Sequence, residues 1–166
     1  KELCGDEAEK LLGFFSHPAR SESLKQEGLM HSIGFAIRAA ACKNKELGIA
    51  QPLYAYNFDA EIPGWDNPGT FHSVDLWFFF ETLAKCWRPF TGKHYDLARN
   101  MCDYWVNFIK TGDPNGLDSQ GEQLPAWPAL TAKEPAWMRF DDRSHAEKWE
   151  ASPLEKFLLA HYLENN

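Results

Sequence analysis

Apolar side chains recur at steps of three and four residues along several stretches of the chain, and this spacing predicts helices. We expect helices over residues 6–15, 21–47, 74–84, 94–111 and 153–162. The apolar face of the second helix combines small and branched residues, which favours close packing against a sheet. This face consists of Leu29, Ile33, Ala36, Ile37 and Ala40.

One stretch alternates with a period of two. Over residues 51–59, Tyr54, Tyr56 and Phe58 are separated by smaller or polar residues, which is typical of a strand. A second, shorter strand is expected at 137–140. A buried strand must pair to satisfy its backbone groups. Either these two strands therefore pair with each other, or their partners lie on sequence outside this chain.

The composition is that of a globular protein. The chain has 166 residues, of which 44% are hydrophobic and 14% aromatic. That length can bury a sizeable core, and no repeat or linker divides it, so we expect one domain over residues 1–166. The formal net charge of −7 argues against a nucleic-acid partner and against adhesion to an anionic membrane. The apolar run at 74–80 is too short to cross a bilayer.

The four cysteines, Cys4, Cys42, Cys86 and Cys102, are widely spaced and form no zinc-binding pattern. Two disulfides are arithmetically possible. Reduced, buried thiols are favoured, because a chain of this size does not need cross-links, and a cytoplasmic location is favoured with them. The chain starts without Met and shows no signal peptide, which leads us to expect that upstream sequence belongs to the same protein.

Three groups of residues carry a family resemblance. The first is 53–59 (LYAYNFD), and the second is 69–80 (GTFHSVDLWFFF). The third, and the most specific, is the ordered series 104–108 (YWVNF), 111–116 (TGDPNG) and 124–128 (LPAWP). With these motifs the chain resembles the C-terminal portion of a type-B carboxylesterase, the family of nitrobenzyl-type esterases and cholinesterases.

This resemblance implies the C-terminal part of an α/β-hydrolase fold, helix-rich here with one or two short strands. In that fold the catalytic triad follows the chain order serine, acid, histidine, so a C-terminal portion holds the histidine alone. The matching residue is His72, which would act as general base towards the serine hydroxyl and then as general acid towards the leaving alkoxide. The substrate would be a carboxylic ester, and no cofactor is implied.

Other residues of the same region receive supporting roles. Gly69 would permit backbone angles closed to other residues, and Asp75 would fix the loop as a hydrogen-bond acceptor, not as the triad acid. Trp65 and Val74 are candidates for contact with the substrate. The aromatic run at 77–80 is expected to pack in the core rather than to line a pocket.

The chain lacks the other parts of an esterase site. No Gly-x-Ser-x-Gly motif occurs, since residues 13–17 (GFFSH) lack the final glycine, and no oxyanion loop is visible. We therefore expect the isolated chain to be inactive and the N-terminal remainder of the same hydrolase domain to be its partner. Two alternatives stay open: a cholinesterase-like binding or adhesion module without catalysis, and a helical domain that self-associates through apolar surfaces.

Overall fold

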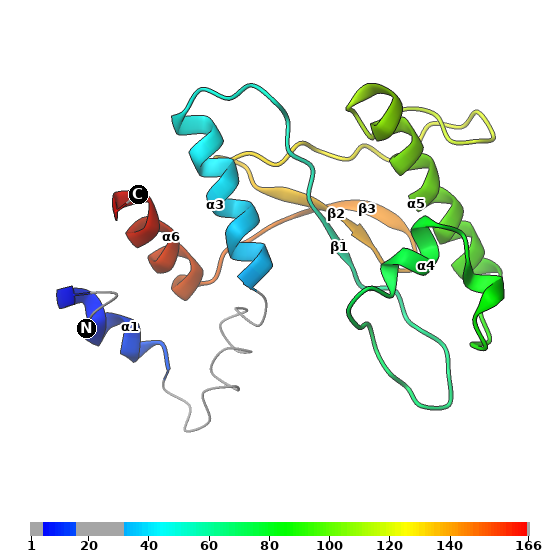
Figure 1. Ribbon diagram of the computed structural model, residues 1–166, viewed down its shortest axis with the longest axis horizontal. Helices are drawn as coiled ribbons and strands as arrows, with labels where there is room; N and C mark the ends of the chain where they lie inside the picture. The colour runs from blue at the N-terminus through cyan, green and yellow to red at the C-terminus, as the bar shows by residue number, and fades with distance from the viewer. Residues whose placement is uncertain (1–4, 16–31, 166) are drawn as a thin grey trace. The chain divides into compact units, whose positions relative to one another are not determined.

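The computed structural model describes residues 5–15 and 32–165 (Figure 1). Its elements, in chain order, are η1 (Gly5–Glu7), α1 (Ala8–Gly13), α3 (Ser32–Glu46), β1 (Tyr56–Phe58), α4 (Asp75–Phe79), η2 (Leu83–Lys85), α5 (Gly92–Thr111), β2 (Ala136–Phe140), β3 (Ser144–Lys148) and α6 (Pro153–Asn165). The chain forms two compact units. One comprises Lys1–Leu53, Leu130–Pro135 and Trp149–Asn166, and the other comprises Tyr54–Ala129 and Ala136–Lys148. A single domain over residues 1–166 stays a prediction.

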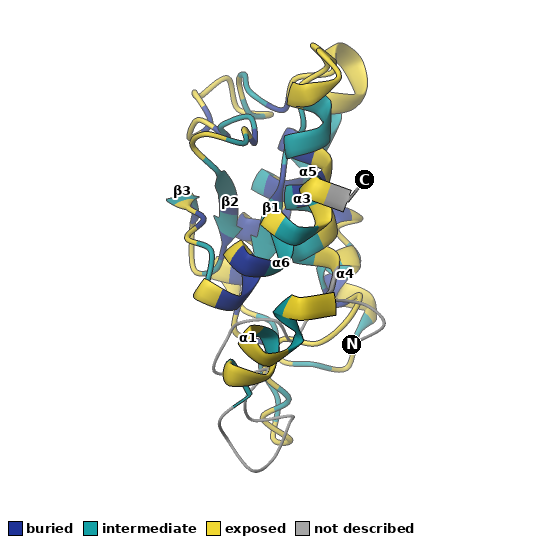
Figure 2. Ribbon diagram, turned by 90° about the vertical axis from the view of Figure 1, so that its left-hand side faces the viewer, coloured by how far each residue is buried: buried dark blue, intermediate teal, exposed yellow. Residues whose placement is uncertain are grey.

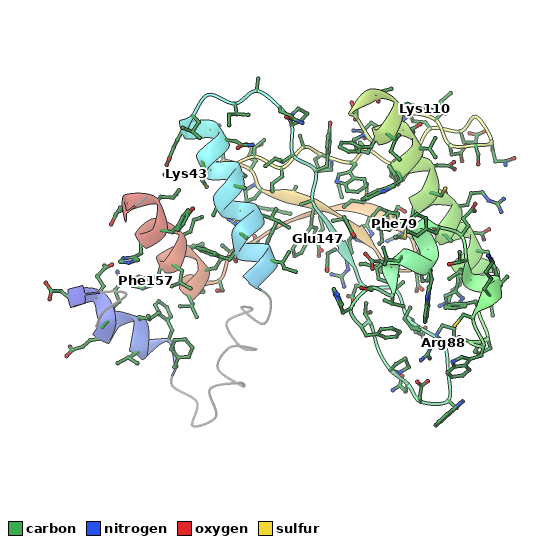
Figure 3. The ribbon with its side chains drawn as sticks, in the orientation of Figure 1. Lys43, Phe79, Arg88, Lys110, Glu147 and Phe157 are labelled. Carbon is green, nitrogen blue, oxygen red and sulfur yellow. The ribbon has the colours of Figure 1, made fainter. Side chains whose placement is uncertain are left out.

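The first unit is built from α1, α3 and α6. The α1 helix has no buried residue (Figure 2), and Phe14, directly after it, places its ring 5.7 Å from that of Phe157 on α6 (Figure 3). The α3 and α6 helices are joined by an ion pair between Arg38 Nε and Glu155 Oε1, 3.3 Å apart. Because both side chains are about nine-tenths buried, this pair fixes the rotation of α3 more firmly than an exposed pair would.

That rotation contradicts the apolar face predicted for α3. Ile33 is 66% exposed, and Ala36 and Ala40 are also exposed, whereas Ala39 and Ala41 are buried. The helix instead turns Gly34 and Arg38 towards Trp149 and α6. A Cβ atom at Gly34 would lie 3.3 Å from the Trp149 ring, and Arg38 Nη1 donates to the Trp149 carbonyl oxygen. Leu29 and the rest of 21–31 lie outside the described residues.

The second unit contains a three-stranded sheet in the order β1-β2-β3. β1 and β2 are parallel, with Tyr56 opposite Met138 and Phe58 opposite Phe140. The two predicted strands therefore do pair. β1 is shorter than the predicted 51–59, and Leu53 instead forms an isolated bridge with Leu130. β3 pairs antiparallel with β2 and was not predicted.

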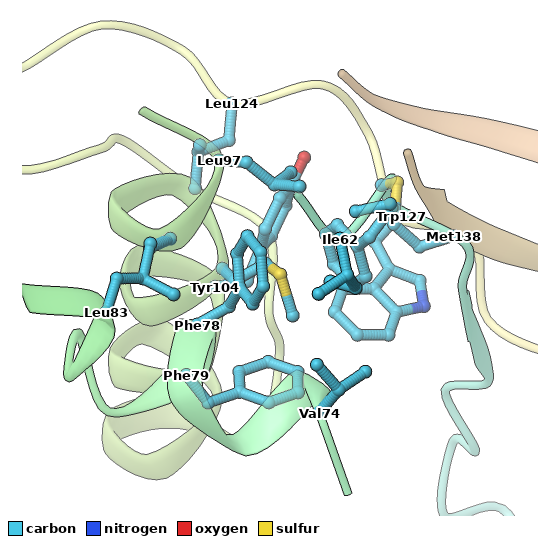
Figure 4. Close-up of a cluster of buried hydrophobic side chains, with 14 residues drawn as sticks. Ile62, Val74, Phe78, Phe79, Leu83, Leu97, Tyr104, Leu124, Trp127 and Met138 are labelled. Atoms are coloured by element: carbon cyan, nitrogen blue, oxygen red, sulfur yellow. The ribbon is translucent and has the colours of Figure 1, made fainter. Parts of the chain in front are cut away.

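The core of this unit lies between the sheet and the α4 and α5 helices (Figure 4). Phe78 and Phe79 are 0% and 5% exposed, which confirms core packing for the middle of the aromatic run. Phe80, in contrast, is 69% exposed. Each fully buried side chain of this size stabilises the fold by about 1.5–3 kcal/mol, so the cluster holds α4 firmly against α5.

The helix predicted over residues 74–84 is wrong in extent. α4 ends at Phe79, and Glu81 has φ +48°, which a continuing helix cannot contain. The Thr82 backbone N–H then donates to the Trp77 carbonyl oxygen at 2.9 Å. The break directs Phe78 and Phe79 into the core and leaves Phe80 at the surface.

The α5 helix lies close to its predicted range of 94–111. Leu97, Met101 and Tyr104 are buried, whereas Phe108 is 42% and Ile109 74% exposed. The helix ends at Gly112, whose φ of +78° is the left-handed conformation common at helix ends. Neither this helix nor any other among the described residues is long and apolar enough to span a bilayer.

The specific series of motifs at 111–128 forms a hydrogen-bonded connection to β1. Asn115 Oδ1 accepts from the Trp127 backbone N–H at 2.7 Å, and Asn115 Nδ2 donates to the Trp127 carbonyl oxygen at 3.0 Å. The Trp127 indole N–H then donates to the carbonyl oxygen of Ala55, just before β1, at 2.9 Å. These residues hold in place the strand that leads to His72.

The cysteines match the prediction of free thiols but not of burial. Cys42, Cys86 and Cys102 are unpaired among the described residues and are only partly buried. Partial burial raises the pKa of the Cys102 thiol. Cys4 lies outside the described residues.

Candidate active site

The segment that carries His72 leaves the sheet at the C-terminal end of β1. The Asp59 backbone N–H donates to the Phe140 carbonyl oxygen at 2.8 Å, which extends the pairing of β1 and β2 by one residue. The loop then runs through 60–74 to α4. Thr70 Oγ1 donates to the Ala60 carbonyl oxygen at 3.2 Å, so the beginning and end of the loop are joined.

Tyr56 ties the start of α4 to the sheet. Its ring lies in β1 among the rings of Phe79 and Trp105, at centroid distances of 5.4 and 6.0 Å. Its hydroxyl donates to Asp75 Oδ2 at 2.7 Å. Burial, and then the hydrogen bond to Asp75, raise the pKa of the Tyr56 hydroxyl. The phenol therefore stays a donor at neutral pH, and it fixes a residue only three positions beyond His72.

His72 lies at the surface, in the turn just before α4. Two left-handed residues flank it: Gly69 with φ +61° and Ser73 with φ +66°. Glycine adopts this conformation without steric cost, whereas for Ser73 it costs about 1–3 kcal/mol. Among the described residues, none hydrogen-bonds to the His72 ring, so the imidazole is available to an external group.

The two candidate substrate contacts differ in their surroundings. Trp65 is 89% exposed, and its ring lies 6.3 Å from that of Trp87, which is itself 61% exposed. Val74 is 1% exposed and belongs to the core cluster. Because Val74 is enclosed by side chains of its own unit, we keep it as a packing residue and retain only Trp65 as a candidate contact.

A charged network covers the exposed face of the sheet beside this loop. Arg139 on β2 pairs with Asp59, Asp141 and Glu147. The Trp137 indole N–H donates to Glu147 Oε2 at 2.9 Å, and this bond, followed by those from Arg139, lowers the pKa of the Glu147 carboxyl. Within the described residues, no group of three or more His, Cys, Asp or Glu side chains is placed to bind a metal ion.

At this site the described residues provide the imidazole of His72, and no serine or carboxylate among them hydrogen-bonds to it. Ser16 and His17, from the incomplete motif at 13–17, lie outside the described residues. The arrangement can supply proton transfer to a hydroxyl brought to His72 from elsewhere in the protein.

Comparison with known proteins gives the family. Residues 22–156 match the model of the carboxylesterase family. The chain belongs to the carboxylesterase family. Among curated members, phenmedipham hydrolase of Pseudarthrobacter oxydans is 31% identical over 116 residues, covering 65% of this chain and 21% of that protein. Human cocaine esterase is 29% identical over 133 residues, covering 76% of this chain and 22% of that enzyme.

The solved structure of another esterase supports the fold. An esterase from Clostridium hathewayi that hydrolyses aliphatic aromatic polyesters matches 98% of this chain and 31% of its own, with a TM-score of 0.60 and 22% identity. The architecture is therefore that of part of an α/β-hydrolase, as the sequence predicted. The chain spans about a fifth of the length of the two curated family members compared above.

Proposed function

We propose that the protein carrying this chain is a serine hydrolase of carboxylic esters, in which His72 is the general base and acid. The observation that carries the proposal is the exposed imidazole of His72, to which no described residue hydrogen-bonds, on the loop that follows β1 in a carboxylesterase-family chain. The Tyr56–Asp75 hydrogen bond supports it, because it fixes the backbone just beyond the histidine.

In the proposed reaction, His72 removes the proton of a serine hydroxyl while the serine oxygen attacks the ester carbonyl. The imidazolium then gives that proton to the leaving alkoxide, which departs as an alcohol and leaves an acyl-serine. A water molecule, deprotonated by the same imidazole, releases the carboxylic acid and restores the serine. The proposal requires no cofactor.

The other groups would come from the N-terminal remainder of the hydrolase domain. A lone imidazole without a nucleophile and oxyanion donors cannot supply acyl transfer at enzymatic rates. We therefore propose that the 166-residue chain is inactive by itself. Trp65 is a candidate wall of the ester site, since an exposed indole offers a flat apolar surface.

The test is hydrolysis of p-nitrophenyl acetate by the intact protein and by its His72→Ala variant. We expect kcat to fall roughly 10²- to 10⁴-fold, the usual contribution of general acid–base catalysis, with an unchanged thermal midpoint. His145→Ala on β3 is the matched control and should retain full activity. Undiminished turnover by His72→Ala would overturn the proposal. If the parent has no serine in an upstream Gly-x-Ser-x-Gly motif, a non-catalytic binding module is favoured instead.

A further inference from the structure

We infer that Arg88 is a positioning residue for His72, acting through a clamp that Arg88 and Asp66 form on the histidine loop. The inference rests on the proposed role of His72. Arg88 comes after α4 and η2 in the sequence, whereas Asp66 lies in the loop before His72. The clamp therefore connects two segments that flank the histidine in sequence.

The clamp is a bidentate pair, with two hydrogen bonds from one guanidinium to one carboxylate. Arg88 Nη1 and Nη2 donate to Asp66 Oδ1 and Oδ2, each at 2.9 Å, and Nη1 also donates to the Pro63 carbonyl oxygen at 3.1 Å (Arg88 in Figure 3). Bidentate pairs of this kind fix orientation as well as distance. The Arg88 side chain is only 8% exposed and that of Asp66 32% exposed, so the guanidinium is held more firmly than in a pair whose two partners are both fully exposed.

The same guanidinium also lies against the residue beside the histidine. Its central carbon is 5.7 Å from the ring centroid of Phe71 and 4.7 Å from that of Trp87. Both distances fall within the range of cation–π attraction. Since Phe71 directly precedes His72, Arg88 holds the loop at two places, at 63–66 and at the position next to the catalytic ring.

The loop has few other attachments. Between residues 63 and 73 of the described chain, the only other side-chain hydrogen bond is that of Thr70 to Ala60. The hydrogen bonds from Arg88 are also the largest cause of a lowered pKa at Asp66. Loss of the clamp would therefore remove three of the four side-chain hydrogen bonds of this segment.

Gly64 offers a way to disturb the clamp without removing either partner. A Cβ atom at this position would lie 2.5 Å from both Arg88 Nη1 and Asp66 Oδ1. Such a contact is too close, so Gly64→Ala should push the two side chains apart. The φ of Gly64 is not in the left-handed region, and the substitution therefore acts through this contact.

The expected consequence for catalysis is a displaced imidazole. A misplacement of about 1 Å at a reacting group costs on the order of 10²-fold in rate. Because neither Arg88 nor Asp66 is placed at the ester, the loss should fall mainly on kcat, and KM should change only through the neighbouring Trp65. A purely structural role would instead lower the thermal midpoint and would act regardless of whether His72 is present.

The experiment measures p-nitrophenyl acetate hydrolysis by the intact protein. We expect Arg88→Gln and Asp66→Asn each to lower kcat roughly 10- to 100-fold, and the double variant to lose no more than either alone. Arg88→Lys, which keeps the charge but not the bidentate geometry, should resemble Arg88→Gln. Arg99→Gln is the matched control, because Arg99 Nε lies 3.8 Å from Glu81 in an exposed pair away from the loop; it should match the wild type.

The decisive comparison repeats Arg88→Gln in the His72→Ala background, where it should cause no further loss. An equal loss in both backgrounds would overturn the inference. It would also be overturned if His72→Ala is inactive but Arg88→Gln alone keeps a kcat within twofold of the wild type. Full activity of His72→Ala would instead refute the proposed function. If Arg88→Gln does not fold, Gly64→Ala and Asp66→Asn decide: a lower kcat in the folded variants supports the clamp, and wild-type kcat refutes it.

Discussion

In the second unit, the Tyr56 side chain contributes in two ways: its ring packs in the core and its hydroxyl forms a hydrogen bond. Its ring completes an aromatic cluster with Phe79, Trp105, Trp127 and Phe140. Its hydroxyl leaves the cluster to reach Asp75. A phenylalanine at position 56 would preserve the first contribution and remove the second, so the two can be separated experimentally.

We predict that Tyr56→Phe lowers the free energy of unfolding of the chain by about 1.5–3 kcal/mol, the usual contribution of a hydrogen bond to a charged group. Urea unfolding monitored by tryptophan fluorescence would measure the loss. Tyr95→Phe is the control, since Tyr95 is 40% exposed and a surface change should stay within about 0.5 kcal/mol. Equal stability of the Tyr56→Phe variant and the wild type would contradict the prediction.

At the scale of elements, the beginning of α5 depends on an unusual cap. The Thr91 backbone N–H donates to His94 Nδ1 at 2.9 Å, so a histidine occupies the place of the glutamate or glutamine of a capping box. His94 makes this cap although it is only 5% exposed. The ring also packs against Phe90 at 5.3 Å.

We predict that His94→Gln keeps the cap, whereas His94→Leu loses it while remaining apolar and bulky. The Leu variant should be less stable than the Gln variant by about 1 kcal/mol, the usual value of a cap. Chemical denaturation of the two variants side by side measures the difference. A Leu variant as stable as the Gln variant would show that packing against Phe90, and not capping, is what His94 contributes.

Helices and strands whose apolar residues recur at regular spacing could be predicted from the sequence, and those without such spacing could not. The α5 and α6 helices and the end of α3 lie close to their predicted positions, because their apolar spacing or a terminal glycine marks them. β3 carries Ser144, His145, Glu147 and Lys148 in five residues, and only its pairing with β2 makes it a strand. The face of α3 was wrong because a buried ion pair overrode the apolar pattern.

The candidate site shows the same division. His72 could be proposed from the sequence because its neighbours form a motif, and its exposure on a turn follows from the surrounding glycine and prolines. The partners of the loop could not be found, since Arg88 and Asp66 are 22 positions apart and no local pattern joins them. Tyr56 and Asp75 are likewise brought together only by the packing of α4 on the sheet.

At the scale of the whole molecule, the chain is acidic, with a formal net charge of −7. Several carboxyls are nevertheless held in their ionised form by hydrogen bonds. The backbone and side chain of Asn115 lower the pKa of Asp113, and Trp137 and Arg139 lower that of Glu147. A carboxyl whose pKa is lower in the folded state stabilises the fold above its ordinary pKa and loses that contribution as the pH falls.

We therefore predict that stability declines on acidification from about the ordinary Glu pKa of 4.5 downwards, as Glu147 and Asp113 become protonated. Urea midpoints measured from pH 7 to pH 3 would follow the decline. Glu147→Gln cannot bind that proton, so its curve should be flatter than that of the wild type over the acidic limb. Parallel curves for the two proteins would contradict the assignment to Glu147.

The exposed ring of His72 has a consequence for how such a protein can diverge. A surface side chain that receives no hydrogen bond from the described residues contributes little to folding, and surface changes of this kind stay within about 0.5 kcal/mol. Selection for a stable protein therefore places almost no constraint on position 72, and only selection for turnover preserves the histidine. One substitution there would yield a folded descendant without activity, which is a short route from an esterase to a protein that only binds.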